Sequence, residues 1–251
     1  MKIAIPSLGR PNPLTLRQIP REWREHTTLY IAERELPDYS RWCQGCKLKP
    51  TGSQRLGLTY VREEIIQDHI GDKVLMIDDD LRFHDSAGKP LDGDGVRAML
   101  LDLSLLLDHS PRVGITPNGD SIRDHIDTFP PICVMGFNLK WIPQAVIDDI
   151  DWHCVPLWED VHTALEMLKR GYGSIMTHRY SWRSEGFNPG GLTETRKHVN
   201  VADCVAKLRE INGEFMSDPI APRSRTGEFD SLEAAFVVDW KRLFNSHNRN
   251  E

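Results

Sequence analysis

The sequence contains no apolar run close to the roughly 18 residues that a membrane helix requires, so we expect no membrane-spanning segment. It also lacks the apolar core of a secretion signal, because Lys2 and three apolar residues are followed at once by Pro6. The five cysteines are odd in number and widely spread, which argues against a disulfide framework. We therefore expect a cytoplasmic protein with reduced thiols and no membrane partner.

The chain has no excess of basic residues: 31 lysines and arginines stand against 37 aspartates and glutamates, for a formal net charge of −6. This balance argues against a protein that binds nucleic acid through a large basic surface. The sequence also lacks a second cysteine pair to accompany Cys43 and Cys46. Whether these two cysteines bind zinc or form a redox pair therefore stays open.

Short apolar segments alternate with amphipathic ones along the chain. Strands are expected near residues 2–6, 29–32, 73–77, 113–117, 132–139 and 174–178. Helices are expected near residues 14–26, 57–70, 96–107, 143–150, 159–171 and 201–211. This alternation predicts an α/β fold, with one Rossmann-like domain and a mostly parallel central sheet flanked by helices. We place the domain at residues 1–217, and a linker with a C-terminal helix packed on it at residues 218–251.

Three consecutive aspartates, Asp78, Asp79 and Asp80, follow the apolar run at residues 73–77. The run is typical of a strand buried on both faces, and open α/β sheets bind ligands at the carboxyl ends of such strands. Adjacent carboxylates repel one another unless a cation or a hydrogen-bond donor compensates. The triplet therefore indicates a site for Mg²⁺ or Mn²⁺ together with a nucleoside diphosphate. The alternative is a plain solvated turn.

Other candidate ligand-binding residues occur earlier in the chain. Pro6 ends the first strand, and Arg10 lies in the loop after it, where an arginine can reach a phosphate or simply face solvent. Residues 36–57 are rich in Pro, Gly and basic side chains, so we expect a loop that covers an anionic ligand. Arg62 lies in the helix that leads to the aspartates. The candidate nucleotide-binding residues are thus Pro6, Arg10, Arg62, Asp78 and Asp79.

A second acidic pair, Glu159 and Asp160, opens an amphipathic helix. Acidic residues in a first turn are favourable against the helix dipole, and this alone explains many such pairs. In the functional interpretation, a carboxylate fixed at this helix start acts as a general base. The following strand-like run ends at His178, which is either a structural histidine or a metal ligand.

The order of these features resembles the GT-A glycosyltransferases, which are metal-dependent nucleotide-sugar enzymes with a single Rossmann-like domain. The shared features are a first strand with Pro-x-x-Gly-Arg, the aspartate triplet after an apolar run, a Gly-containing strand, Trp-Glu-Asp at a helix start and a strand that ends at a histidine. The resemblance covers roughly residues 1–185. It implies the GT-A fold and transfer of a sugar from a nucleotide-sugar donor, such as UDP-glucose.

The resemblance also implies a role for each matching residue. Asp78 would contact the ribose or base of the donor nucleotide. Asp80 would bind Mn²⁺ or Mg²⁺, with His178 as the second protein ligand of the ion. Asp160, with Glu159 beside it, would deprotonate the acceptor hydroxyl in an inverting displacement. Retaining enzymes of this fold share the same aspartates, so whether the reaction inverts or retains the configuration of the sugar stays open too.

Farther along the chain, Gly190, Gly191 and Arg196 match a Gly-Gly-x(4)-Arg pattern. This pattern resembles the TET-associated glycosyltransferases of bacteriophages, which are thought to glycosylate 5-hydroxymethylpyrimidines in phage DNA. The acceptor would then be 5-hydroxymethylcytosine in DNA, and the protein would act in the host cytoplasm. Gly136 and Trp158, together with these three residues, would bind the acceptor or the diphosphate.

Three other functions are compatible with parts of this pattern. The acceptor could be a saccharide or a protein instead of DNA. A nucleotidyltransferase of the same fold would need a Gly-rich loop with arginine and lysine after the first strand, of which Gly9-Arg10-Pro11 offers little. A nucleotide-binding module without catalysis would follow if the aspartates bound no metal.

Overall fold

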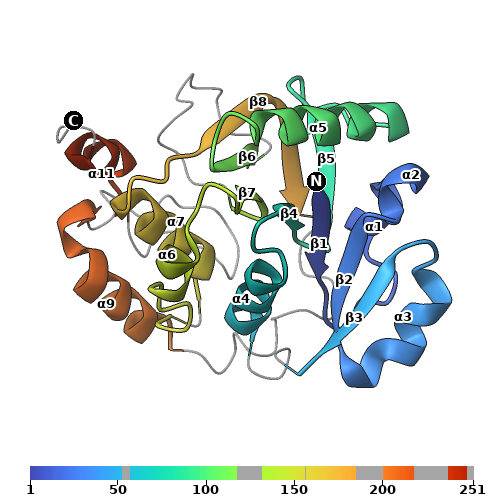
Figure 1. Cartoon of the computed structure of the whole chain (residues 1–251), viewed down its shortest axis with the longest axis horizontal. Helices are drawn as coiled ribbons and strands as arrows, with labels where there is room; N and C mark the ends of the chain where they lie inside the picture. The colour runs from blue at the N-terminus through green and yellow to red at the C-terminus, as the bar shows by residue number, and fades with distance from the viewer. Residues whose placement is uncertain (53–56, 118–131, 156, 185–199, 218–236, 248–251) are drawn as a thin grey trace, which may run out of the picture.

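The computed structural model describes the chain except residues 53–56, 118–131, 156, 185–199, 218–236 and 248–251. It is an α/β fold built on one eight-stranded sheet, in the order β3-β2-β1-β4-β7-β6-β8-β5 (Figure 1). The strands are β1 (Lys2–Pro6), β2 (Thr27–Ala32), β3 (Lys47–Thr51), β4 (Lys73–Ile77), β5 (Leu81–Asp85), β6 (Arg112–Pro117), β7 (Val134–Asn138) and β8 (Ile175–Ser184).

The sheet is mostly parallel, as the sequence predicted. In the described part of the chain, four neighbouring strand pairs are parallel and three are antiparallel. Because β7 runs antiparallel to both β4 and β6, these two strands point the same way. The carboxyl ends of β1, β4, β6 and β8 therefore meet at one edge of the sheet, which is the usual place for a ligand.

Helices flank the sheet on both faces. They are α1 (Leu14–Gln18), α2 (Arg21–Arg24), α3 (Leu36–Trp42), α4 (Leu58–Asp68), α5 (Gly93–Leu106), α6 (Gln144–Asp148), α7 (Glu159–Lys169), α9 (Val201–Asn212) and α11 (Trp240–His247). Two 3₁₀ turns, η1 (Glu33–Glu35) and η3 (Gly213–Phe215), and a small antiparallel pair, β9 (Met216–Ser217) with β10 (Val237–Val238), complete the described elements.

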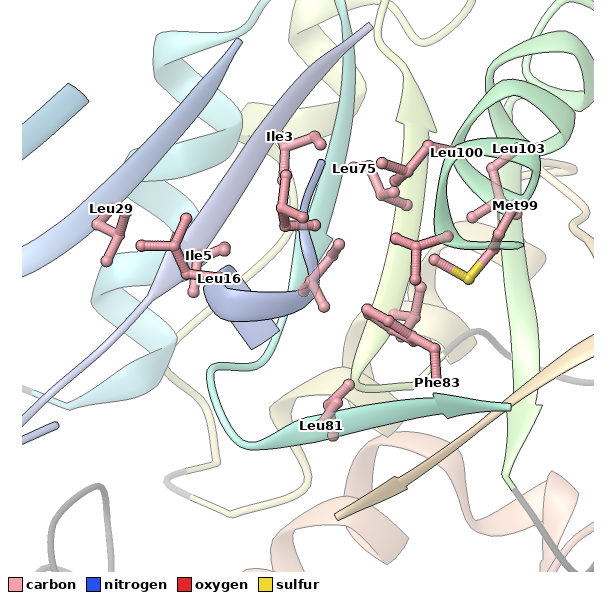
Figure 2. Packing of buried hydrophobic residues seen from close by; sticks show 14 of the residues in the cluster. Ile3, Ile5, Leu16, Leu29, Leu75, Leu81, Phe83, Met99, Leu100 and Leu103 are labelled. Atoms are coloured by element: carbon pink, nitrogen blue, oxygen red, sulfur yellow. The ribbon is translucent and has the colours of Figure 1, made fainter. Parts of the chain in front are cut away.

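The sheet separates two layers of buried side chains, because successive residues of a strand point to opposite faces. Ile3 and Ile5 of β1 lie in one layer, and Ala4 between them lies in the other. Figure 2 shows the first layer, in which these isoleucines share a cluster with Met99 and Leu103 of α5. The second layer is covered by α4, α6 and α7. Both faces of the central strands are therefore dry, as their continuous apolar runs predicted.

The prediction of a loop at residues 36–57 is wrong for much of this range, which forms regular structure. The chain forms α3 there and then β3, which pairs with β2 at the edge of the sheet. Tyr39 of α3 is almost fully buried. The polar composition hid these elements because β3 is an edge strand in which Thr51 alone is buried, so little apolar sequence is needed.

The strand expected to end at His178 continues to Ser184, which is a second correction. Its extension pairs antiparallel with β5, a strand that the sequence did not predict directly after the aspartates. Leu81 pairs with Ser184, and Asp85 pairs with Tyr180. The two strands support each other, so neither is evident from its own sequence alone.

The last described helix, α11, packs against α7. Leu243 is buried in a cluster with Leu165 and Leu168 of α7 and with Phe215. The expected linker lies largely outside the described residues, so the domain boundary at residue 217 stays a prediction. None of the helices described in Figure 1 is long and apolar enough to cross a membrane.

Candidate active site

The three aspartates form a turn at the carboxyl end of β4, and backbone contacts fix this turn. Asp78 N donates a hydrogen bond to Cys133 O, with 2.9 Å between the atoms. Thr15 donates from Oγ1 to Asp78 O at 2.6 Å and from its backbone nitrogen to Asp79 O at 3.1 Å. The start of α1 and the segment before β7 therefore hold the triplet in place.

Asp79 is the most buried of the three aspartates, with a side chain only 7% exposed. Ser7 Oγ donates to its Oδ2 at 2.5 Å, and Arg10 Nη1 lies 2.5 Å from its Oδ1. Ser7 Oγ also shares a hydrogen bond of 2.7 Å with the hydroxyl of Tyr39. Asp79 thus ties the loop after β1 to β4 and α3, and its exposure leaves little room for direct contact with a ligand.

Asp80 is more open than Asp79, with a side chain 20% exposed. Its Oδ2 lies 3.3 Å from Arg10 Nη1 and accepts a hydrogen bond of 3.3 Å from Ser184 Oγ at the end of β8. Both contacts are longer than the usual distance for a charge-assisted hydrogen bond. Asp80 is therefore the aspartate of the triplet most able to exchange partners.

Arg62 of α4 lies at the centre of a second group of carboxylates. Its side chain is only 5% exposed, and its Nη2 donates to Asp78 Oδ1 at 2.9 Å. Its Nη1 lies 2.8 Å from Glu159 Oε1 and 3.9 Å from Asp160 Oδ2. One guanidinium therefore joins the aspartate triplet to the acidic pair at the start of α7. The guanidinium is thus engaged inside the protein, and the nucleotide contact expected of Arg62 stays a prediction.

The acidic pair is held by an unusual helix start. Trp158, the residue before α7, has left-handed backbone angles (φ 60°, ψ 34°), which a bulky residue rarely adopts. Asp160 Oδ1 accepts a hydrogen bond of 2.8 Å from Val161 N in the first turn. Glu159 lies closer to Arg62 than Asp160 does, so Asp160 is the less constrained of the two carboxylates.

The charges in this cluster do not balance, and the pKa values reflect this. Burial alone would lower the pKa of Arg62, but Glu159, Asp78 and Asp160 outweigh it and raise the pKa further. Burial raises the pKa of Glu159 and Asp160 above their usual ranges, although Arg62 opposes the shift. One guanidinium cannot neutralise three carboxylates, so the pair binds a proton more readily than free carboxylates do. A general base needs such a raised affinity.

Asp79 and Asp80 of the triplet also hold protons more strongly than usual. Burial raises the pKa of Asp79 to about 6 against the opposing effects of Arg10 and Ser7. Burial and then the charge of Asp78 raise the pKa of Asp80. Asp78 and Asp80 therefore repel each other across the site, whereas Asp79 between them is directed toward Ser7.

The structure brings together most of the predicted site residues. Within the described part of the chain, Pro6, Arg10, Arg62, Asp78, Asp79, Asp80, Trp158, Glu159 and Asp160 belong to the carboxyl end of β1 or β4, to the α4 helix beside them, or to the start of α7. Gly190, Gly191 and Arg196 lie outside the described residues, so their roles stay predictions.

His178 does not join this group, which corrects the expected pairing of Asp80 and His178 on one ion. Ser184 is the residue of β8 that contacts Asp80, and His178 lies six residues before it. The register of β8 against β6 shifts between Thr177 and Ser181, so His178 lies in the irregular part of the strand and Ser184 at its end. His178 instead lines a groove between β8 and α5 with Asp102 and Leu105. We expected His178 near Asp80 because the sequence predicted that this strand ends at His178, whereas β8 ends at Ser184.

Gly136 is also absent from the site, and its role is packing rather than ligand contact. It lies inside β7, where it pairs with Leu75 of β4 and Val113 of β6. A Cβ atom at this position would come within 2.5 Å of Val113 Cγ2. The glycine therefore makes room for a neighbouring side chain in the sheet.

The carboxylate oxygens of Asp78 and Asp80 suit a divalent cation such as Mg²⁺. Among the described residues, no group of three or more His, Cys, Asp or Glu side chains is arranged to hold a metal ion. Asp78 and Asp80 nevertheless offer carboxylate oxygens that repel each other and remain partly exposed. Mg²⁺ often binds to one or two carboxylates together with substrate phosphates, which agrees with this arrangement.

Four site residues escaped the sequence prediction. Ser7 follows Pro6 directly, so its place at the end of the first strand was a signal that could have found it. Tyr39 lies on a helix that was not expected, and Ser184 lies on an unexpected extension of β8. Cys133 has a positive φ of 59°, and its carbonyl anchors Asp78, but nothing in its sequence neighbourhood indicates either feature.

Comparisons with known proteins bear on the fold. No family model and no curated protein matches the sequence. Among solved structures, TarS of S. aureus in complex with UDP-GlcNAc matches at 13% identity and a TM-score of 0.50. The fold is similar to that of TarS. This likeness confirms the predicted α/β fold class, with its mostly parallel sheet flanked by helices.

The match to TarS covers 86% of this chain and 66%, just under two thirds, of that one. A second TarS structure, in complex with UDP, matches at 12% identity and a TM-score of 0.46, covering 100% of this chain and 92% of that one. The glycosyltransferase GlyE of Streptococcus pneumoniae TIGR4 matches at 16% identity and a TM-score of 0.37, covering 99% and 63%. At these identities the likeness concerns the fold alone.

Proposed function

We propose that this protein is a glycosyltransferase that moves a sugar from a UDP-sugar to a hydroxyl acceptor. The observation that carries the proposal is the position of two pairs of carboxylates near one guanidinium. Asp78 and Asp80 follow a central strand, Glu159 and Asp160 begin α7, and Arg62 contacts Asp78, Glu159 and Asp160. The fold shared with TarS, which was crystallised with UDP-GlcNAc, supports the choice of donor.

The donor side of the site is the aspartate turn with the loop after β1. In this proposal Asp78 faces the nucleoside, and Asp80 with Asp78 supplies oxygen ligands for Mn²⁺ or Mg²⁺. The bound cation would offset the negative charge of the departing diphosphate. Asp79 keeps the loop after β1 in place through Ser7 and Arg10, so it supports the site without contacting the donor.

The acceptor side is the start of α7. Asp160 takes the proton from the acceptor hydroxyl, and the oxygen attacks the anomeric carbon of the sugar. A new bond forms between that oxygen and the anomeric carbon as the bond to the diphosphate breaks, which inverts the configuration. Glu159 is held more closely by Arg62, so we assign it to positioning and Asp160 to proton transfer.

For the acceptor, we favour 5-hydroxymethylcytosine in DNA. The support is the Gly190-Gly191-x(4)-Arg196 pattern, and the cytoplasm of a phage-infected host would be the place of action. A net charge of −6 suits a small contact with DNA rather than an extended one. A saccharide or protein hydroxyl is the alternative acceptor class.

A panel of nucleotide sugars tests this proposal. The purified protein is incubated with Mn²⁺, each UDP-sugar and DNA that contains 5-hydroxymethylcytosine, and the digested nucleosides are analysed by mass spectrometry. We expect one sugar mass to be added to 5-hydroxymethylcytosine, and unmodified cytosine DNA serves as the control. Sugar transfer to water or to a saccharide, without any change in the DNA, would support the glycosyltransferase activity and exclude DNA as the acceptor.

A further inference from the structure

Arg10 contacts two aspartates of the triplet with a single nitrogen. Its Nη1 lies 2.5 Å from Asp79 Oδ1 and 3.3 Å from Asp80 Oδ2. Asp79 is buried and also accepts a hydrogen bond from Ser7, so its contact with Arg10 is part of the protein interior. The contact with Asp80 is longer and lies at the more exposed carboxylate. Arg10 is therefore firmly held at one aspartate and loosely held at the other.

A guanidinium and a divalent cation cannot both approach the same carboxylate oxygen without repelling each other. Asp80 Oδ2 is the oxygen nearest to Arg10, and Asp80 is also the carboxylate best placed to bind the cation. We propose that Arg10 competes with the cation for Asp80 and leaves Asp80 when a diphosphate arrives with the cation. This inference rests on the proposed function, because it concerns the cation and the diphosphate of the same site.

The diphosphate matters because it offers Arg10 another partner. An arginine binds phosphate oxygens in a two-pronged geometry that is stronger than the contact at 3.3 Å. Arg10 follows Gly9, whose φ of 69° places the loop in a tight turn, and Arg10 N donates to the hydroxyl of Tyr39 at 3.1 Å. The backbone of Arg10 is thus anchored, while its side chain can exchange the Asp80 carboxylate for the diphosphate.

The consequence is that cation and nucleotide bind cooperatively. A cation alone must displace Arg10 from Asp80 and then remain beside a guanidinium that has lost one of its two aspartate contacts. A cation that arrives with a diphosphate brings the replacement partner for that charge. Each ligand therefore raises the affinity for the other, as linked binding requires.

The test measures Mn²⁺ binding by electron paramagnetic resonance, first without nucleotide and then with saturating UDP. The Arg10→Gln variant should bind Mn²⁺ without nucleotide about tenfold more tightly than the native protein, because one competing charge is removed. Added UDP should strengthen Mn²⁺ binding in the native protein and do so less in the variant. Arg17→Gln, which removes a charge from an exposed position of α1, is the control for net charge and should behave as native.

An Arg10→Gln variant that binds Mn²⁺ alone no more tightly than the native protein would overturn the inference. If that variant does not fold, because Asp79 has lost its cationic partner, Arg10→Gln combined with Asp79→Asn carries the same test. It is compared with Asp79→Asn alone, and the tenfold difference is again expected. Neither arm measures sugar transfer, so a failure of the glycosyltransferase proposal and a failure of this competition give different results.

Discussion

Arg62 and Glu159 form an ion pair inside the site, with 2.8 Å between Nη1 of the arginine and Oε1 of the glutamate. The two residues are far apart in the sequence and lie on α4 and on the first turn of α7. The same guanidinium donates to Asp78 at the end of β4. One buried side chain thus fixes the distance between the two halves of the proposed active site.

Replacing Arg62 with methionine should destabilise the protein, because three carboxylates would lose their shared cation. Removing one partner of a buried ion pair typically costs about 3–5 kcal/mol, so we expect the free energy of unfolding to fall by about that amount. Urea unfolding at pH 7 measures it. Arg17→Met, at an exposed position, should change the free energy by about 0.5 kcal/mol or less. Equal stability of the two variants would show that Arg62 does not hold the cluster together.

Asp160→Asn should remove turnover and leave donor binding intact, because asparagine keeps the shape of the side chain but accepts no proton. The loss of a general base typically lowers the rate by about 10²–10⁴-fold. Transfer rates and UDP binding are both measured, the second by calorimetry. Asp203→Asn is the matched control, since Asp203 occupies the first turn of α9 and is exposed. An Asp160→Asn variant with the native transfer rate would rule out the assigned base.

Arg112 at the start of β6 is fully buried, and none of its three guanidinium nitrogens has a hydrogen-bond partner among the described residues. Its guanidinium carbon lies 5.7 Å from the centre of the Phe137 ring. Arg112→Met should therefore raise the free energy of unfolding at pH 7, by about 1–3 kcal/mol, because it removes an unpaired buried charge and keeps the apolar stem. Arg112→Lys, which keeps the charge, should bring no such gain.

The benefit of Arg112→Met should depend on pH in a defined direction. Burial lowers the pKa of Arg112 to about 9, below its usual 12.5. The folded protein therefore carries the penalty of the buried charge below pH 9 and loses it as the pH rises further. Unfolding measured at pH 7 and at pH 10 should show a smaller difference between native protein and variant at pH 10. A difference that grows with pH would contradict the assignment.

Asp79 gives a pH dependence in the acid range. Burial raises its pKa from the usual 3.8 to about 6. A carboxyl with a raised folded-state pKa contributes stability that is full below about pH 4 and is lost as the pH rises through about 6. In metal-free buffer the native protein should therefore lose about 3 kcal/mol relative to Asp79→Asn between these pH values. Parallel pH profiles of the two proteins would show that Asp79 ionises normally in the fold.

Local patterns were enough to predict the two acidic groups and the elements that carry them. The aspartates follow a continuous apolar run, and Glu159 with Asp160 opens an amphipathic helix, so each group has its own signature within about ten residues. Both faces of β4 are buried, as such a run predicts, because the sheet is covered on both sides.

The sequence could not predict relationships that depend on pairing between distant segments. β8 extends past His178 only because β5 lies beside it, so the metal role given to His178 followed from a strand end that does not exist. The place of Arg62 among three carboxylates needs the packing of α4 against the sheet and α7. The sequence predicted a ligand contact at Gly136, but the glycine is needed because a Cβ atom there would clash with Val113 on the neighbouring strand.

We expect the aspartate turn to bind a nucleoside diphosphate together with a divalent cation. Calorimetry of UDP binding in the presence of Mn²⁺, with the native protein and with Asp80→Ala, measures this binding. We predict saturable binding to the native protein and an affinity at least about tenfold weaker for the variant. A native protein that binds no nucleoside diphosphate with Mn²⁺ or Mg²⁺, or an Asp80→Ala variant that binds UDP as tightly as the native protein, would show that the aspartate turn is not the nucleotide site.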